Sequence, residues 1–93
     1  MECRQTVFSG HAIRRMFQRQ ISIAAVRTTL EEGDVIASYP DERPYPSYLL
    51  LAWPDGVPLH LVVTRDPESL TCQVVTVYRP DPALWQNDFR RRR

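Results

Sequence analysis

One stretch near the N-terminus, His11–Arg19, combines residue types that bind phosphate and transfer protons. At about 100° per residue, His11, Arg15 and Arg19 fall on one stripe of a helix. A guanidinium group offers a planar pair of donors to phosphate, and an imidazole exchanges a proton near neutral pH. The spacing therefore suits a phosphate-bearing partner.

Two other interpretations of this stretch stay open. Composition alone favours an ordinary amphipathic helix with a solvated charged face, because apolar residues occupy the opposite arc. Alternatively, the arginines pair within the chain with Glu31, Glu32 or Asp34 and only stabilise the fold. The apolar arc that we expect to be buried consists of Ala12, Ile13, Met16 and Phe17.

A second candidate group lies in the C-terminal half, where His60, Thr76 and Tyr78 share one face of the predicted strands, with Arg79 at the rim. Cleavage of RNA without a metal needs a base for the ribose 2′-OH, an acid for the 5′-oxygen and cations for the phosphorane. Histidine and tyrosine supply the first two, and arginine supplies the third. A buried, hydrogen-bonded His60 is an equally weighted alternative.

The loop between residues 39 and 48 adds aromatic side chains. Tyr45 is a candidate for stacking on an unpaired base. The alternative is that Tyr45 ties the loop to the sheet edge, and Asp41 and Glu42 favour that alternative because they repel a nucleic-acid backbone. The arginines at 90–93 are expected to form a mobile basic tail that adds affinity for any polyanion.

The local pattern predicts an α+β domain with two N-terminal helices, a mainly antiparallel four-stranded sheet and a short C-terminal helix. Ser9 and Ser22 are typical N-caps, and Gly33 is a typical helix stop. A further short strand at 6–8 is possible. The expected helices span residues 10–20, 23–32 and 82–89, and the expected strands span residues 34–39, 47–53, 57–65 and 71–79.

The pair Asp55-Gly56 predicts a hairpin turn between the second and third strands. That turn places Leu50 opposite Leu61 and leaves both faces of the hairpin largely apolar, so the hairpin should be central and covered on both sides. In the last strand, strict alternation directs Val75 and Val77 to the core and Thr76 and Tyr78 to the other face.

Length and composition indicate one domain over residues 1–89, followed by the tail. The net charge of +1 conceals a segregation: residues 1–30 carry +4, residues 31–68 carry −6 and residues 69–93 carry +3. Basic ends suit a polyanionic partner. The absence of a long apolar run favours the cytoplasm, where Cys3 and Cys72 are expected to be free thiols.

The whole pattern resembles a family of small bacterial proteins grouped with the RelE/ParE-like and BrnT-like toxins. The resemblance covers roughly residues 8–86. It is carried by His11-Ala12, Arg15-Met16, Arg19, Ile21, Gly33-Asp34-Val35-Ile36, Tyr39-Pro40-Asp41, Pro44-Tyr45-Pro46-Ser47, Pro58-Leu59-His60-Leu61-Val62-Val63 and Val75-Thr76-Val77-Tyr78-Arg79-Pro80-Asp81.

This resemblance implies two N-terminal helices packed on a curved antiparallel sheet. It implies a toxin-like ribonuclease that cleaves mRNA, often on the ribosome, with no metal or cofactor, and a cognate antitoxin of zinc-finger or helix-turn-helix type. The residues it carries over are His11, Arg15, Arg19, His60 and Tyr78. The competing hypothesis is a non-catalytic module that keeps the fold and binds a protein.

Overall fold

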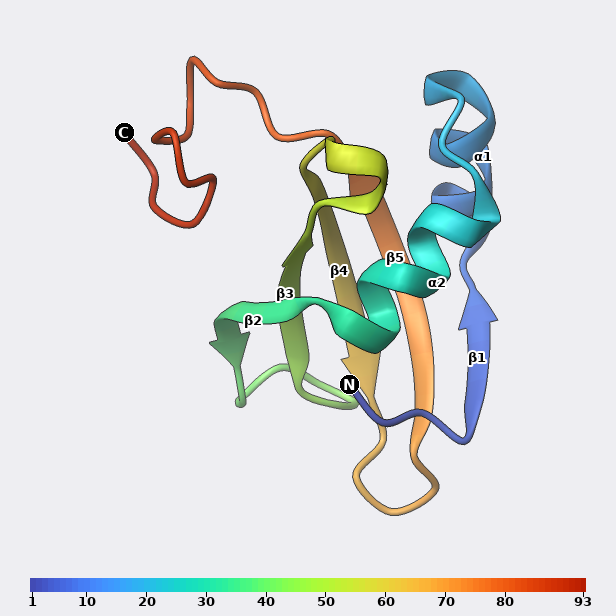
Figure 1. Ribbon diagram of the computed structural model, residues 1–93. Coiled ribbons are helices and arrows are strands. Elements are labelled where there is room, and N and C mark those ends of the chain that lie inside the picture. Colours follow the sequence, from blue (N-terminus) through green and yellow to red (C-terminus); the bar gives the residue numbers. More distant parts are fainter.

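The computed structural model describes residues 1–93 and shows two helices and a five-stranded sheet in the order β1–β5–β4–β3–β2 (Figure 1). The elements are β1 (Gln5–Phe8), α1 (Gly10–Arg19), α2 (Ile23–Glu32), β2 (Asp34–Tyr39), β3 (Ser47–Ala52), the 3-10 turn η1 (Pro54–Gly56), β4 (Leu59–Arg65) and β5 (Thr71–Tyr78). All neighbouring strands are antiparallel except β1 and β5, which are parallel.

The expected fold is therefore wrong in two respects. The sheet is mixed and has five strands, because the short N-terminal strand adds in parallel at the β5 edge. The C-terminal helix is absent, and residues 80–93, here called the C-terminal segment, form turns. The helical spacing of Trp85 and Phe89 was misleading: Trp85 packs on His60 while Phe89 packs on Trp53. These separate contacts hold the backbone in an irregular path, with Phe89 at a positive φ of 56°.

Both helices begin where their caps predict. Ser9 accepts a hydrogen bond from the Ala12 amide, and Ser22 accepts one from the Ala25 amide. Gly33 ends α2, and a Cβ at this position would lie 2.3 Å from the Thr29 carbonyl oxygen. Only glycine therefore permits the close approach of the chain here. Neither helix is long and apolar enough to cross a membrane.

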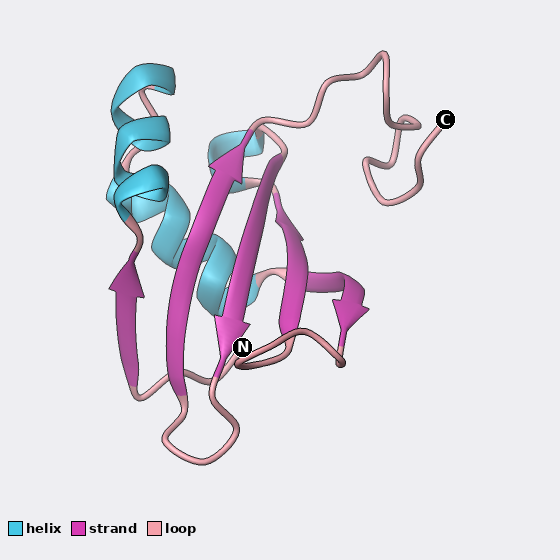
Figure 2. Cartoon of the chain, turned by 180° about the vertical axis from the view of Figure 1, so that it is seen from behind, coloured by secondary structure: helices cyan, strands magenta, loops and turns pink.

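The core lies between the helices and one face of the sheet, where α2 crosses the strands (Figure 1). The predicted hairpin register is confirmed, since Leu50 pairs with Leu61 and both side chains are fully buried. The opposite face carries no helix (Figure 2). Its upper part near β3 and β4 is covered instead by Trp85 and Phe89 of the C-terminal segment.

Helix α1 buries less of its apolar arc than the sequence suggests. Ala12 is fully buried and Met16 packs against the core, but Ile13 is 56% exposed and Phe17 is 88% exposed. The reason is that α1 lies along the edge of the sheet and its main tertiary contacts are with β5. The expectation that all four apolar residues are buried is wrong for Ile13 and Phe17.

The two cysteines form a disulfide, so the expectation of free thiols is also wrong. Thr6 of β1 pairs with Cys72 of β5, and this parallel pairing brings the preceding Cys3 close to Cys72 across 69 residues of sequence. The disulfide fastens the N-terminus beside the start of β5. The Met1 amine also donates a hydrogen bond to the Leu30 carbonyl at the end of α2.

Candidate functional site

A groove of about 490 Å³ lies between α1 and the C-terminal half of β5. It brings together five of the seven predicted site residues and leaves out His60 and Tyr45. The residues that line it are His11, Arg15, Arg19, Thr76, Val77, Tyr78, Arg79 and Asp81.

The groove forms because β1 ends partway along β5, and α1 lies beside the remaining part of that strand. The ladder between β1 and β5 ends where Phe8 pairs with Val74. The next residue, Ser9, then donates from its amide to the Val74 carbonyl and from its hydroxyl to the Val75 carbonyl. These bonds hold the first turn of α1 against β5, so that His11 Nε2 lies 3.0 Å from Thr76 Oγ1.

A β-bulge turns the polar side chains of β5 toward the groove. Val63 pairs with Val74 and Val62 pairs with Thr76, so Val75 is an extra residue. Val74 and Val77 are fully buried on the core face, whereas Thr76 pairs with Val62 on the opposite face. The shared face of Thr76 and Tyr78 is confirmed, but the core position expected for Val75 belongs to Val74.

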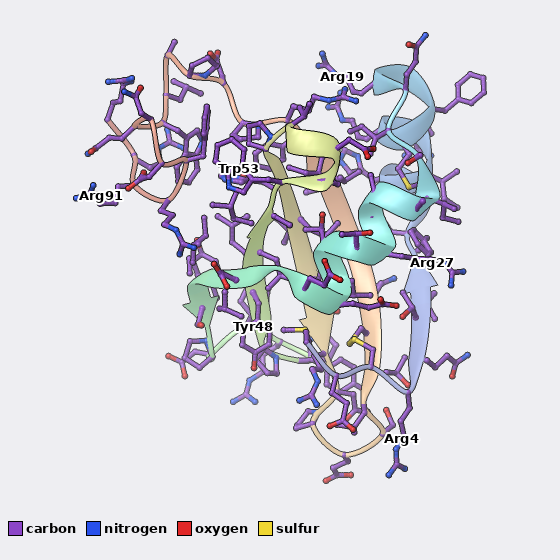
Figure 3. All side chains as sticks on the ribbon, in the orientation of Figure 1. Arg4, Arg19, Arg27, Tyr48, Trp53 and Arg91 are labelled. Atoms are coloured by element: carbon purple, nitrogen blue, oxygen red, sulfur yellow. A yellow bond between two sulfur atoms is a disulfide. The ribbon has the colours of Figure 1, made fainter.

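The arginines on α1 are unpaired. Neither Arg15 nor Arg19 forms a salt bridge, and Asp34 pairs instead with Arg90 of the C-terminal segment. The interpretation in which this stripe only closes internal ion pairs is therefore wrong. Arg19 lies at the same end of the molecule as the end of β5, whereas Arg27 of α2 projects away from it (Figure 3).

Arg79 joins the two walls of the groove. Its guanidinium donates to the Arg19 carbonyl at 2.7 Å and to the Gln20 carbonyl at 3.4 Å. These carbonyls end α1 and have no partner within the helix, so Arg79 satisfies them and fixes the end that carries Arg19. Asp81 is the one acidic residue in the lining, and the three arginines leave the groove with a positive charge.

His60 lies behind the groove and is fully buried. Its Nε2 is 2.8 Å from the Phe89 carbonyl oxygen, which only accepts, so this nitrogen carries the hydrogen. Nδ1 therefore accepts from the Tyr78 hydroxyl at 3.2 Å, and the Trp85 ring packs edge-on at 4.5 Å between centroids. Burial lowers the pKa of His60 although the bond to Phe89 opposes this, so the ring is neutral at pH 7.

Tyr78 connects His60 to the groove. Its hydroxyl gives its hydrogen to His60, which leaves the oxygen lone pairs as acceptors. Burial raises the pKa of Tyr78, and the nearby Arg92 charge opposes this only in part. The phenol therefore stays protonated at neutral pH.

Tyr45 lies at the other end of the sheet. It lines a separate hollow with residues near the start of β5, including Thr71. Thr71 and Tyr78 are seven residues apart on one strand, which corresponds to about 23 Å. The tail arginines also have defined positions, since Arg90 pairs with Asp34 and Arg91 pairs with Asp88.

Two features of the site carried little signal in the sequence. The contact of His11 with Thr76 joins residues that are 65 apart in the sequence, and it depends on the parallel pairing of β1 with β5. The cover over His60 depends on Trp85 and Phe89 in an irregular segment. No group of three or more His, Cys, Asp or Glu side chains is placed to hold a metal ion.

Residues 8–79 match a protein family described as Domain of unknown function (DUF4258). The chain belongs to the DUF4258 family. The DUF4258 match runs from the end of β1 through β5 and contains every residue of the groove lining except Asp81. No curated protein and no solved structure matches the chain.

Proposed function

We propose that this DUF4258 protein is a toxin-like endoribonuclease that cleaves RNA in the groove between α1 and β5. The observation that carries the proposal is the pair of unpaired arginines, Arg15 and Arg19, beside an exposed histidine and a hydrogen-bonded tyrosine. Cations, an acid and a base are the three components that metal-independent cleavage requires.

Arg15 and Arg19 bind the scissile phosphate. They stand one helical turn apart on α1, and neither forms a salt bridge within the chain. Arg79 uses two of its five N–H groups to hold the end of α1, which leaves three for the phosphate. The planar guanidinium groups match the negative charge that builds on the phosphorane oxygens.

Tyr78 and His60 act together as the base. The ribose 2′-OH gives its proton to the Tyr78 oxygen while the phenol passes its own proton to Nδ1 of His60, which burial keeps unprotonated at neutral pH. The 2′-oxygen then attacks phosphorus and the bond to the 5′-oxygen breaks. His11, as imidazolium, donates a proton to the leaving 5′-oxygen, and the products are a 2′,3′-cyclic phosphate and a 5′-hydroxyl.

The test is cleavage of a labelled single-stranded RNA by the purified protein in EDTA, with the product ends identified by mass spectrometry. We expect His11→Ala and Tyr78→Phe each to lower the cleavage rate by about 100-fold or more, because each removes a proton-transfer group. Expression of the wild-type chain should arrest bacterial growth, and the same variants should relieve that arrest.

Arg27→Ala is the matched control for this test. Arg27 lies on α2 and lines no part of the groove, so its loss removes one positive charge without touching the site. Cleavage by this variant should equal that of the wild type. Unchanged cleavage by both His11→Ala and Tyr78→Phe would refute the proposed roles, and products with a linear 3′-phosphate from the first turnover would refute the mechanism.

The exposed apolar pair on α1 supports a protein partner. Ile13 and Phe17 lie one turn apart and are 56% and 88% exposed, on the arc of α1 opposite the arginine stripe. An antitoxin that covers Phe17 would bind the side of α1 that faces away from the groove. The same pair favours the second candidate function, a non-catalytic module that binds a protein and leaves RNA intact.

Coexpression with the product of the adjacent reading frame separates these functions. We expect Phe17→Glu to abolish the complex, because it places a charge at the centre of the apolar contact. Val35→Glu is the matched control, since Val35 is 48% exposed on β2 at the other edge of the sheet. A complex that resists Phe17→Glu would exclude this surface, and a stable complex of a chain that never cleaves RNA would favour the module.

A further inference from the structure

The open face of β5 connects the groove to the hollow at Tyr45. Strand pairing and the bulge place Thr71, Gln73, Thr76 and Tyr78 on the face opposite the buried Cys72, Val74 and Val77. No helix crosses this face, and the C-terminal segment lies toward the β2 and β3 side (Figure 2). The surface of β5 is therefore uncovered from one site to the other.

The hollow at the far end measures about 320 Å³. Tyr45 is 40% exposed at its edge, so part of the aromatic ring is accessible. Uncharged hydrogen-bonding side chains make up most of the remaining surface. The lining consists of Val7, Tyr45, Thr64, Asp66, Ser69, Thr71 and Gln73.

The single charge in the hollow selects which part of a nucleotide can enter. Asp66 is fixed because its carboxylate accepts from the Glu68 amide at 2.9 Å. This bond, with smaller contributions from Ser69 and Tyr45, lowers the pKa of Asp66 and keeps it charged. A carboxylate repels phosphate but accepts hydrogen bonds from the amino group of a base. The hollow therefore suits a nucleobase, whereas the groove suits phosphate.

The separation of the two sites fits one short strand of RNA. Thr71 in the hollow and Thr76 in the groove are five residues apart on β5, which corresponds to about 17 Å. That distance suits the lower end of the roughly 4–16 nucleotides that sheet-based single-strand sites hold. We propose that the hollow at Tyr45 is a nucleobase subsite, and that the RNA runs along the open face of β5 from Arg15 and Arg19 to Tyr45. This proposal rests on the proposed function, since the groove must hold the scissile phosphate.

The test compares the affinities of two fluorescent 2′-O-methyl oligonucleotides, a dinucleotide and an octanucleotide, which bind but cannot be cleaved. Tyr45→Ala should weaken binding of the octanucleotide by roughly 5- to 150-fold, the usual effect of losing one aromatic stacking partner. It should leave the dinucleotide unchanged, because that probe reaches only the groove. Tyr45→Phe should retain most of the octanucleotide affinity, since it keeps the ring.

The outcomes separate this proposal from the proposed function. Equal octanucleotide affinity for Tyr45→Ala and the wild type would overturn the subsite, and so would an equal loss for both probes. Arg15→Ala should weaken the binding of both probes by the same factor. If Arg15→Ala changes neither probe, the groove does not bind phosphate, and the proposed function fails together with the RNA path.

Discussion

The two histidines of this chain both form a hydrogen bond to β5, yet they occupy opposite environments. His11 is exposed on α1 and lies 3.0 Å from the Thr76 hydroxyl. His60 is fully buried, and both of its ring nitrogens have partners. A polar group that is buried and fully bonded stabilises the fold that holds it, whereas an exposed group with a free face is available to a ligand. In the sequence both histidines are equally good site candidates. Only their environments in the folded protein distinguish them.

The largest expected difference between the two is in stability. His60→Ala should lower the free energy of unfolding by about 3 kcal/mol, because it leaves a cavity and removes the partners of the Tyr78 hydroxyl and the Phe89 carbonyl. Loss of the Trp85 contact should also free the C-terminal segment. Urea unfolding followed by tryptophan fluorescence measures both effects.

His11→Ala is the matched control, with an expected change within about 0.5 kcal/mol because the site is exposed. Comparable losses from the two variants would contradict the distinction drawn between the two environments. A cleavage defect in His60→Ala at a temperature where the variant stays folded would separate its effect on Tyr78 from its effect on stability.

A smaller decrease in the free energy of unfolding is expected when the pH is lowered. Burial lowers the pKa of His60 below its ordinary value of 6.5, so the unfolded chain takes up a proton at a higher pH than the folded chain does. The stabilising contribution is therefore complete above about pH 6.5 and decreases as the pH falls, by at most about 1.4 kcal/mol per pH unit. Asp66 and Asp88, whose pKa values are lowered from 3.8, act only in a more acidic range.

Urea unfolding at a series of pH values between 5 and 7.5 measures this effect. The slope of the free energy of unfolding against pH should persist in His11→Ala and disappear in His60→Ala. A slope that survives the loss of His60 would assign the titration to another group and would weaken the distinction between the two histidines.

Local rules predicted much of the fold. The Ser9 and Ser22 caps defined the starts of both helices, and Asp55-Gly56 defined the register of β3 and β4. The local pattern also placed His11, Arg15 and Arg19 on one helix and Tyr78 on a strand, although it did not bring these two groups together. These features depend on neighbours in the sequence, where spacing carries information.

The features that were missed depend on long-range contacts. The parallel pairing of β1 and the disulfide from Cys3 to Cys72 join segments almost 70 residues apart, and no local pattern encodes them. The C-terminal segment is irregular because Trp85 and Phe89 pack on different aromatic partners, although their spacing is typical of a helix. The burial of His60 follows from that packing, so local sequence patterns do not predict its environment either.

The bulge at Val75 has a consequence for how such a site arises. Because side chains alternate along a strand, one additional residue exchanges the faces of everything that follows it unless the ladder accommodates that residue as a bulge, as it does Val75. Deleting Val75 would leave Val74 and Thr76 paired with Val63 and Val62 in regular alternation, so Thr76 and Tyr78 would stay on the face opposite the core and Val77 would stay in the core. An insertion of one codon can therefore arise at this position without exchanging the residues that face the groove.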